Sequence, residues 1–341
     1  MFSRLPFALA LALALALELP LAATAADAPP QQFADLGDVR LESGAVIKDC
    51  KLGYRTVGTL NAARSNAVVF LPWHTGKSSE AVSLLGPKGL FNTAGHYVIV
   101  IDAIGNGVAC SPSNSTAQHG TAFPTFNVRD MVESEYRLLS EKLGLKHVHA
   151  IVGYSMGATQ AFQWMVSHPG YMDVAVPIAG TPRQTSYDLL FWRTEEAAML
   201  ADPQYANGEY QQNPKLALYH QIFSLNFDTP AYRAAKTKPA EVDKFIAETV
   251  EDDPDAADAN DMRWQMRAFL AQDIGDDAAK KVKARVHIIN PRQDLIVNPA
   301  PALAFARQIG ATTTVLQGDC GHSAVTCASD QIRAAVDRAL K

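Results

Sequence analysis

The sequence predicts an α/β fold with a mostly parallel sheet flanked by helices and interrupted by one helical insertion. Apolar stretches without polar alternation, such as residues 97–101, are typical of strands that are covered on both faces. Helical patterns separate these stretches along the chain, and such alternation favours a parallel sheet. One long region, residues 183–281, is helix-prone throughout and shows no strand pattern.

Each element is expected from its local pattern. Strands are expected at residues 51–56, 67–71, 97–102, 148–153, 174–179, 286–290 and 313–316, and helices at residues 128–143, 159–167, 300–309 and 328–340. Residues 27–32, which contain Pro-Pro and Gln-Gln, are expected to form a disordered leader. Residues 27–182 and 282–341 are the predicted core. Residues 183–281 are the predicted lid, over the carboxyl edge of the sheet, where open α/β folds bind ligands.

Residues 1–26 are predicted to be a secretory signal peptide. Arg4 precedes an almost unbroken Leu/Ala run, and the small residues Ala23-Thr24-Ala25 are typical of a cleavage site. The alternative is a membrane anchor, but Glu18 and Pro20 interrupt the run before the roughly 20 apolar residues that a span requires. We therefore expect a periplasmic or secreted protein with no membrane span in the mature chain.

The charge balance bears on the class of partner. The chain has 30 Lys and Arg against 35 Asp and Glu, which gives a formal net charge of −5. No broad basic field is then available to hold a polyanion, so nucleic-acid binding is not expected.

Four cysteines, an even number, permit two disulfides in an oxidising compartment, with three possible pairings. Cys320 and Cys327 are seven positions apart and form the first expected pair, which leaves Cys50 with Cys110. A metal site is the competing idea, but the spacings lack a C-x-x-C pair and only His322 is near. Neither a metal nor a cofactor is expected.

The motif Gly153-Tyr154-Ser155-Met156-Gly157 lies between a predicted strand and a predicted helix. In this context G-x-S-x-G forms a sharp turn that projects the serine hydroxyl from the sheet edge, and the glycines allow close helix packing. Ser155 is therefore the predicted nucleophile. The alternative is a serine in an ordinary turn between strand and helix.

A serine hydroxyl needs a base to remove its proton, so a histidine and a carboxylate should follow in the order Ser, Asp or Glu, His. Asp294 and His322 each follow a late predicted strand, which places both at the same sheet edge as Ser155. His322 is the predicted base, and Asp294 is predicted to fix its tautomer. Asp319 is the alternative acid, although it lies on the same loop as His322 and could merely cap a turn.

Two backbone N–H groups are expected to bind an oxyanion. The N–H of Met156 follows the nucleophile and lies at the positive end of a helix. A second N–H, from His74 or Trp73, is expected in the turn after the strand at residues 67–71.

These residues, together with several further segments, resemble the α/β-hydrolase superfamily and, within it, the homoserine O-acetyltransferase family. The further segments are Lys51-Leu52-Gly53-Tyr54-Arg55-Thr56, Gly58-Thr59-Leu60-Asn61, Thr75-Gly76, Ile101-Asp102-Ala103-Ile104-Gly105-Asn106-Gly107, Ser111-Pro112-Ser113, Gln160-Ala161, Trp164, Asp258-Ala259-Asn260, Asp294-Leu295 and Gly321-His322. The resemblance implies an α/β-hydrolase fold and an acyl-serine intermediate. It also implies a homodimer formed through the lid and an arginine, Arg183, that binds a substrate carboxylate. Tyr154 is the second predicted substrate-binding residue.

Two departures from the family pattern concern the acyl acceptor. The acetyltransferases usually have Asp after the catalytic His to hold the amino group of homoserine, whereas Ser323 follows His322 here. A charge-assisted hydrogen bond contributes roughly 1.5 to 3 kcal/mol, so its loss weakens selection of homoserine. The family's Asn-Ser-Tyr run is also replaced, because Asn260 is followed by Asp261 and Met262. Finally, an exported enzyme would lack cytoplasmic acetyl-CoA.

The leading hypothesis is an exported serine hydrolase that cleaves a carboxylic ester or small amide. Its apolar pocket under the lid is predicted to include Trp73, Phe191, Trp192, Phe223, Trp264 and Phe269. The alternative is an O-acyltransferase of the homoserine O-acetyltransferase type, because both reactions share the acyl-serine step. A non-catalytic binding protein that retained the fold is the third reading.

Overall fold

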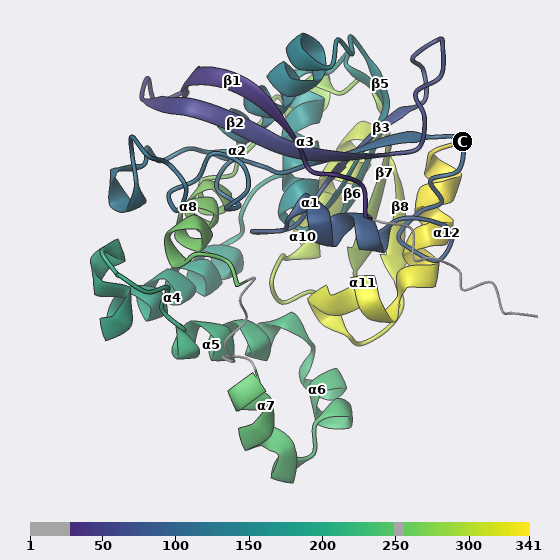
Figure 1. The fold of residues 1–341 in the computed structure, drawn as a ribbon. Coiled ribbons are helices and arrows are strands. Elements are labelled where there is room, and N and C mark those ends of the chain that lie inside the picture. Colours follow the sequence, from purple (N-terminus) through teal and green to yellow (C-terminus); the bar gives the residue numbers. More distant parts are fainter. Residues whose placement is uncertain (1–27, 249–255) are drawn as a thin grey trace, which may run out of the picture.

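The computed structural model describes residues 28–248 and 256–341 (Figure 1). The predicted signal peptide therefore lies outside the described residues. An eight-stranded sheet runs through the centre, in the order β1-β2-β4-β3-β5-β6-β7-β8. The two junctions of β2, with β1 and with β4, are antiparallel, and all others are parallel. The predicted α/β fold with a mostly parallel sheet is confirmed.

The strands span Gln32–Arg40 (β1), Val46–Val57 (β2), Ala67–Leu71 (β3), Tyr97–Ile101 (β4), Val148–Tyr154 (β5), Met172–Ile178 (β6), Arg285–Pro291 (β7) and Thr312–Leu316 (β8). The helices around the sheet span Ser78–Ala81 (α1), Val128–Arg137 (α2), Met156–Ser167 (α3), Pro299–Ile309 (α10), Ala324–Cys327 (α11) and Ser329–Ala339 (α12).

Helices cover both faces of the sheet, which explains why its central strands are apolar without alternation. On β3, Val69 and Leu71 join the core cluster that contains residues of α2, α3 and α10. Val68 and Phe70 point the other way, into the cluster that contains residues of α1 and α12. Successive side chains of a strand alternate between faces, so apolar residues are required at every position.

The disordered leader predicted for residues 27–32 is wrong at its end, because β1 begins at Gln32. The side chain of Gln31 is also fixed, since its Nε2 donates to Asp102 Oδ2 at 2.9 Å. β1 escaped prediction because irregular pairing with β2 around Gly37 interrupts the period-two pattern that marks a strand.

Between β6 and β7 the described residues form helices and add no strand to the sheet (Figure 1). We call residues 183–281 the insertion. Its helices span Ser186–Ala201 (α4), Ala217–Phe227 (α5), Pro230–Lys236 (α6), Val242–Glu248 (α7), Ala259–Leu270 (α8) and Ala278–Lys281 (α9). Figure 1 shows α4, α5, α6 and α7 outside the sheet layers, in the lower part of the view. α5 contacts the turn that carries His322.

The structure pairs Cys50 with Cys110 and Cys320 with Cys327, one of the three pairings that the sequence allows. The first bridge ties β2 to the loop after β4, and the second closes the loop that contains His322. No helix within residues 28–248 and 256–341 is long and apolar enough to cross a membrane.

Glu135 is a buried carboxylic acid on α2, at its contact with α3. Glu135 is inaccessible to solvent, and its Oε2 accepts the indole N–H of Trp164 at 2.8 Å. Its second oxygen has no hydrogen-bond partner. Burial raises the pKa of Glu135 from its ordinary 4.5 to about 8, although the Trp164 hydrogen bond acts in the opposite direction. The folded chain therefore keeps this carboxyl neutral at pH 7.

This raised pKa predicts that the free energy of unfolding depends on pH. The Glu135→Gln variant should lack this dependence, because glutamine does not titrate. Between pH 4.5 and pH 8 the unfolded chain releases the Glu135 proton while the folded chain keeps it, so wild-type stability falls across that window. We expect the variant to gain on the order of 3 kcal/mol relative to wild type between pH 5 and pH 8. Urea unfolding at several pH values measures this difference.

Glu141→Gln is the control, because Glu141 is about half exposed and forms a surface pair with Arg137 at 3.4 Å. Its stability difference from wild type should stay constant over the same range. A Glu135→Gln variant that follows the wild-type pH dependence would contradict the assignment of a neutral carboxyl.

Candidate active site

The turn between β5 and α3 holds Ser155 in a strained conformation. Its φ of +55° lies in a region that residues with a side chain rarely adopt, at a cost of about 1 to 3 kcal/mol. A Cβ atom at Gly153 would collide with the Gly157 carbonyl, and one at Gly157 would collide with the Leu71 carbonyl. The two glycines of the motif therefore let α3 approach β5 and β3 closely, and Ser155 Oγ is presented at the carboxyl edge of the sheet.

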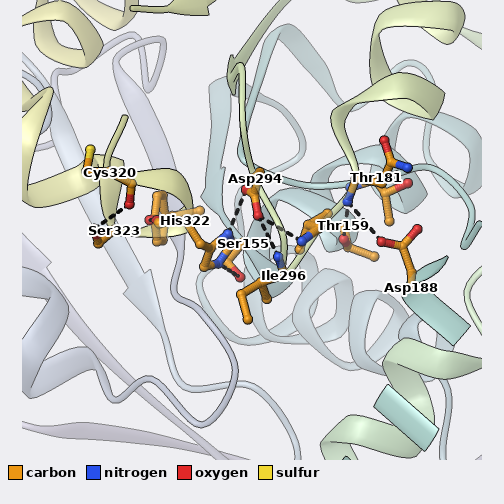
Figure 2. A network of polar contacts seen from close by, with 12 residues as sticks. Ser155, Thr159, Thr181, Asp188, Asp294, Ile296, Cys320, His322 and Ser323 are labelled. Carbon is orange, nitrogen blue, oxygen red and sulfur yellow. Dashed lines mark hydrogen bonds and ion pairs between the residues drawn. The ribbon is translucent and has the colours of Figure 1, made fainter. Parts of the chain in front are cut away.

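His322 and Asp294 meet Ser155 at this edge (Figure 2). His322 Nε2 lies 2.8 Å from Ser155 Oγ, and its Nδ1 lies 2.7 Å from Asp294 Oδ2. All three residues are buried, with exposures of 3%, 7% and 5% for His322, Ser155 and Asp294. Sequence analysis placed these three residues at one sheet edge, and the structure brings them into hydrogen-bonding contact.

The backbone fixes the carboxylate of Asp294. Its Oδ1 accepts the N–H groups of Ile296 and Val297, each at 2.9 Å, which leaves Oδ2 for the histidine (Figure 2). An imidazole that donates Nδ1–H to this carboxylate presents Nε2 as an acceptor toward the serine hydroxyl. The arrangement can therefore take a proton from Ser155 and stabilise the resulting imidazolium. Asp319, the alternative acid, is not in this chain of bonds.

Tyr154 contacts the turn that carries the histidine. Its buried side chain donates from Oη to the backbone carbonyl of His322. Burial raises the pKa of Tyr154, so the phenol stays protonated and remains a donor. This bond supports the His322 turn, and the substrate-binding role of Tyr154 stays a prediction.

The predicted oxyanion donors belong to two segments, the start of α3 and the turn after β3. Met156 is the first residue of α3, so its N–H has no acceptor within the helix. In the turn after β3, the N–H of Thr75 donates to Gln265 Oε1 at 2.7 Å and that of Gly76 donates to the Trp73 carbonyl at 2.9 Å. These bonds leave Trp73 and His74 as the candidate second donors of this turn, as the sequence indicates.

The His74 side chain is a structural anchor of the same turn. Its Nε2 lies 2.8 Å from the Met262 carbonyl of α8, and burial lowers the pKa of His74 to about 4. The ring is therefore neutral at pH 7 and donates to Met262. Gln265, one turn further along α8, accepts from Thr75 and donates from Nε2 to the Ile104 carbonyl at 2.9 Å. Sequence reasoning missed Gln265 because no local motif marks a partner 190 positions away.

A row of aromatic side chains of the insertion leads up to the histidine. The Phe227 ring lies 5.8 Å from the His322 imidazole, and Phe223 lies 5.4 Å from Phe227. Trp192 then lies 6.3 Å from Phe223 and 5.8 Å from the ring of His74. Trp192 and Phe223 were predicted pocket residues, whereas Phe227 was missed, although Tyr219, Phe223 and Phe227 recur at helical spacing.

Other predicted pocket residues lie elsewhere. The Trp264 indole N–H donates to the Phe123 carbonyl at 2.9 Å, inside the main core cluster. Phe269 contacts Trp192 at 5.4 Å and Phe191 contacts it at 5.0 Å, so both support the aromatic row from behind. Trp73 is half-buried beside Tyr154, at 6.4 Å.

Arg183, the predicted carboxylate-binding residue, pairs with two aspartates of the insertion. Its guanidinium donates to Asp273 at 2.9 Å and to Asp276 at 2.8 Å, and the side chain is 42% exposed. Two surface carboxylates already neutralise this arginine, so the structure does not present it as a carboxylate-binding group. Within the described part of the chain, no group of three or more His, Cys, Asp or Glu side chains is placed to hold a metal ion.

Comparison with known proteins agrees with this geometry. The family described as alpha/beta hydrolase fold matches residues 84–325. The chain belongs to the α/β-hydrolase family. A probable esterase of Corynebacterium glutamicum is 30% identical over 92% of this chain and 95% of its own length. A homoserine O-acetyltransferase of Geotalea daltonii is 32% identical over 58% of this chain and 59% of its own.

A solved α/β-hydrolase structure resembles the whole chain. That protein, an acetylester hydrolase from Corynebacterium glutamicum, has a TM-score of 0.84 and 26% identity, and the match covers 91% of this chain and 96% of the other. The resemblance to homoserine O-acetyltransferases is confirmed, and esterases share it. The chain is an esterase-like α/β hydrolase, from a group in which hydrolysis and acyl transfer both occur.

The bonds of Gln265 predict that its loss impairs activity without unfolding the protein. In Gln265→Ala the Thr75 N–H and the Ile104 carbonyl lose their partners, so the turn after β3 loosens. We expect kcat on an aryl acetate to fall about 10-fold or more, since misplacing one oxyanion donor has that effect.

Gln163→Ala is the matched control, because Gln163 is equally buried and donates to Ser167 of its own helix, α3, rather than to the turn after β3. Steady-state kinetics and a thermal melt are measured for both variants. Equal kcat values in the two would show that the turn does not need the Gln265 bonds for activity.

Proposed function

We propose that this chain is an exported serine esterase that cleaves short-chain carboxylic esters, acetates above all, and also admits small amides. The hydrogen-bonded chain of Ser155, His322 and Asp294 at the carboxyl edge of the sheet is the observation that carries the proposal. The esterase and acetylester hydrolase that match nearly the full chain support ester hydrolysis and an acetyl group.

Ser155 is the nucleophile in this proposal. Its Oγ attacks the ester carbonyl carbon while His322 Nε2 takes the hydroxyl proton. The carbonyl oxygen becomes an oxyanion, which the N–H of Met156 and that of Trp73 or His74 stabilise. His322 then gives its proton to the departing alcohol, and the acyl group remains on Ser155.

Water completes the cycle. His322 takes a proton from the water as its oxygen attacks the acyl carbon, and the proton returns to Ser155 Oγ as the carboxylic acid leaves. Core residues 27–182 and 282–341 supply the nucleophile, acid and base, and the insertion acts as a lid. The aromatic row of Trp192, Phe223 and Phe227 supplies an apolar wall close to His322.

The second candidate is acyl transfer of the homoserine O-acetyltransferase type, which the relatives of that name favour. Two features count against it. Ser323 replaces the Asp that usually binds the acceptor amine, and the nearby carboxylate of Asp228 already accepts from Ser323 and pairs with Arg233. An ammonium group would therefore find no free carboxylate beside His322 among these residues.

Removal of the nucleophile tests the proposal. We expect Ser155→Ala to reduce hydrolysis of p-nitrophenyl acetate by roughly 10⁴-fold, because acylation needs the hydroxyl. Ser134→Ala is the control, since Ser134 is an equally buried serine that donates to the Met131 carbonyl of its own helix. An inactive wild type across an ester panel, or equal rates for wild type and Ser155→Ala, would contradict the proposal.

The acceptor is tested separately. We expect homoserine not to accelerate the release of CoA from acetyl-CoA above the rate of acetyl-CoA hydrolysis measured without homoserine. We also expect no accumulation of O-acetylhomoserine, measured by mass spectrometry. Accumulation of that product faster than free acetate would favour the transferase instead.

Export is proposed from residues 1–26 and agrees with the two disulfides. Expression of the full chain in a bacterial host should release a protein that begins at residue 26 or 27, found in the periplasmic fraction by mass spectrometry. Replacing Arg4 and three leucines of the apolar run with Asp should retain the uncleaved chain in the cytoplasm. The homodimer through the lid stays a prediction.

A further inference from the structure

A buried carboxylate of the insertion lies against the turn that carries His322. Asp228 lies between α5 and α6, is 6% exposed, and its Oδ1 accepts the Ser323 hydroxyl at 2.6 Å. Ser323 directly follows His322, and its Oγ also lies 2.7 Å from the Cys320 carbonyl. The carboxylate is the stronger of these two acceptors because it is charged. The hydroxyl therefore links Asp228 to the turn one residue after the histidine.

The neighbours of Asp228 contact the same turn. The Thr229 hydroxyl donates to the Asp319 carbonyl, and the Phe227 ring lies 5.8 Å from the His322 imidazole. Gly321 has a φ of +62°, and a Cβ there would lie only 3.1 Å from the Phe227 carbonyl oxygen. Residues 227–229 of the insertion thus lie against the turn both before His322, at Asp319 and Gly321, and after it, at Ser323.

The second oxygen of Asp228 is also occupied. Its Oδ2 forms an ion pair with Arg233 of α6, and the Arg233 guanidinium stacks on the Phe245 ring of α7 at 4.0 Å. Arg233 neutralises the charge of Asp228, and Ser323 and Arg233 each bond to one of its oxygens. Its position favours support of the turn over recognition of a ligand.

We propose that Asp228 is a positioning residue for His322 that acts through the Ser323 hydroxyl. The inference rests on the proposed function, since it assigns His322 the role of the base. Three supports then fix the turn from different directions: Tyr154 from the core, the Cys320–Cys327 bridge within the turn, and Asp228 from the insertion. The imidazole keeps both of its bonds only while the turn holds this position.

Removing either end of the Asp228–Ser323 bond should lower kcat and leave KM unchanged. We expect Asp228→Ala and Ser323→Ala each to reduce kcat on p-nitrophenyl acetate about 10-fold, because a small displacement of a catalytic group has an effect of that size or more. Asp228→Asn keeps an oxygen acceptor for Ser323 and should restore most of the activity. Glu196→Gln is the control, since Glu196 pairs with Arg263 and Arg267 elsewhere in the insertion.

Proton NMR provides a readout that a purely structural role would not move. The Nδ1–H of His322, donated to Asp294, should give a far-downfield resonance in wild type, Asp228→Asn and Glu196→Gln, and should broaden or shift in the two Ala variants. Thermal melts are recorded alongside. Should Asp228→Ala fail to fold, Ser323→Ala decides the outcome, because it leaves the Asp228–Arg233 pair intact.

The two levels of the hypothesis fail differently. If wild type and Ser155→Ala hydrolyse esters equally, the proposed function is wrong. If Ser155→Ala is inactive but Ser323→Ala matches wild type in kcat, the function stands and the role of Asp228 is overturned. A loss of kcat with an unchanged His322 resonance would overturn it as well.

Discussion

The hydrogen bond between Ser155 Oγ and His322 Nε2 joins two segments that are 167 positions apart. Neither side chain reaches the other by itself, because one lies after the central strand β5 and the other after the edge strand β8. Parallel pairing of β5, β6, β7 and β8 brings the ends of these strands to one edge. The sheet therefore converts a long separation in sequence into a distance of 2.8 Å.

Ser155 is positioned by the close packing of the backbone around it, whereas His322 is positioned by hydrogen bonds from other segments. Ser155 keeps a positive φ because β5 and α3 hold the turn from both ends and the flanking glycines permit their approach. His322 lies in a short turn with little regular structure of its own. Its position therefore comes from Asp294, from the Tyr154 hydroxyl and from residues of the insertion.

This difference explains how much the sequence could predict. Ser155, Asp294 and His322 each follow a predicted strand of a mostly parallel sheet, so their places in the sequence put them at one edge. Strand β1 was missed because irregular pairing near Gly37 breaks its period. The partners of Tyr154 and Arg183, which are the His322 carbonyl and two surface aspartates, could not be predicted because they depend on tertiary contacts. Gln265 and Asp228 had no local motif, since their partners lie 190 and 95 positions away.

The replacement of Asp by Ser after His322 has a structural consequence beyond the loss of an amine-binding group. A serine hydroxyl at this place donates to Asp228, whereas an aspartate there would set two carboxylates close together in a buried site, which raises the energy of both. Asp228 therefore forms a favourable hydrogen bond with a serine at position 323, whereas an aspartate at position 323 would repel it. In the proposed esterase, the preference for water over an amine acceptor would involve the α5–α6 segment as well as the residue after the histidine.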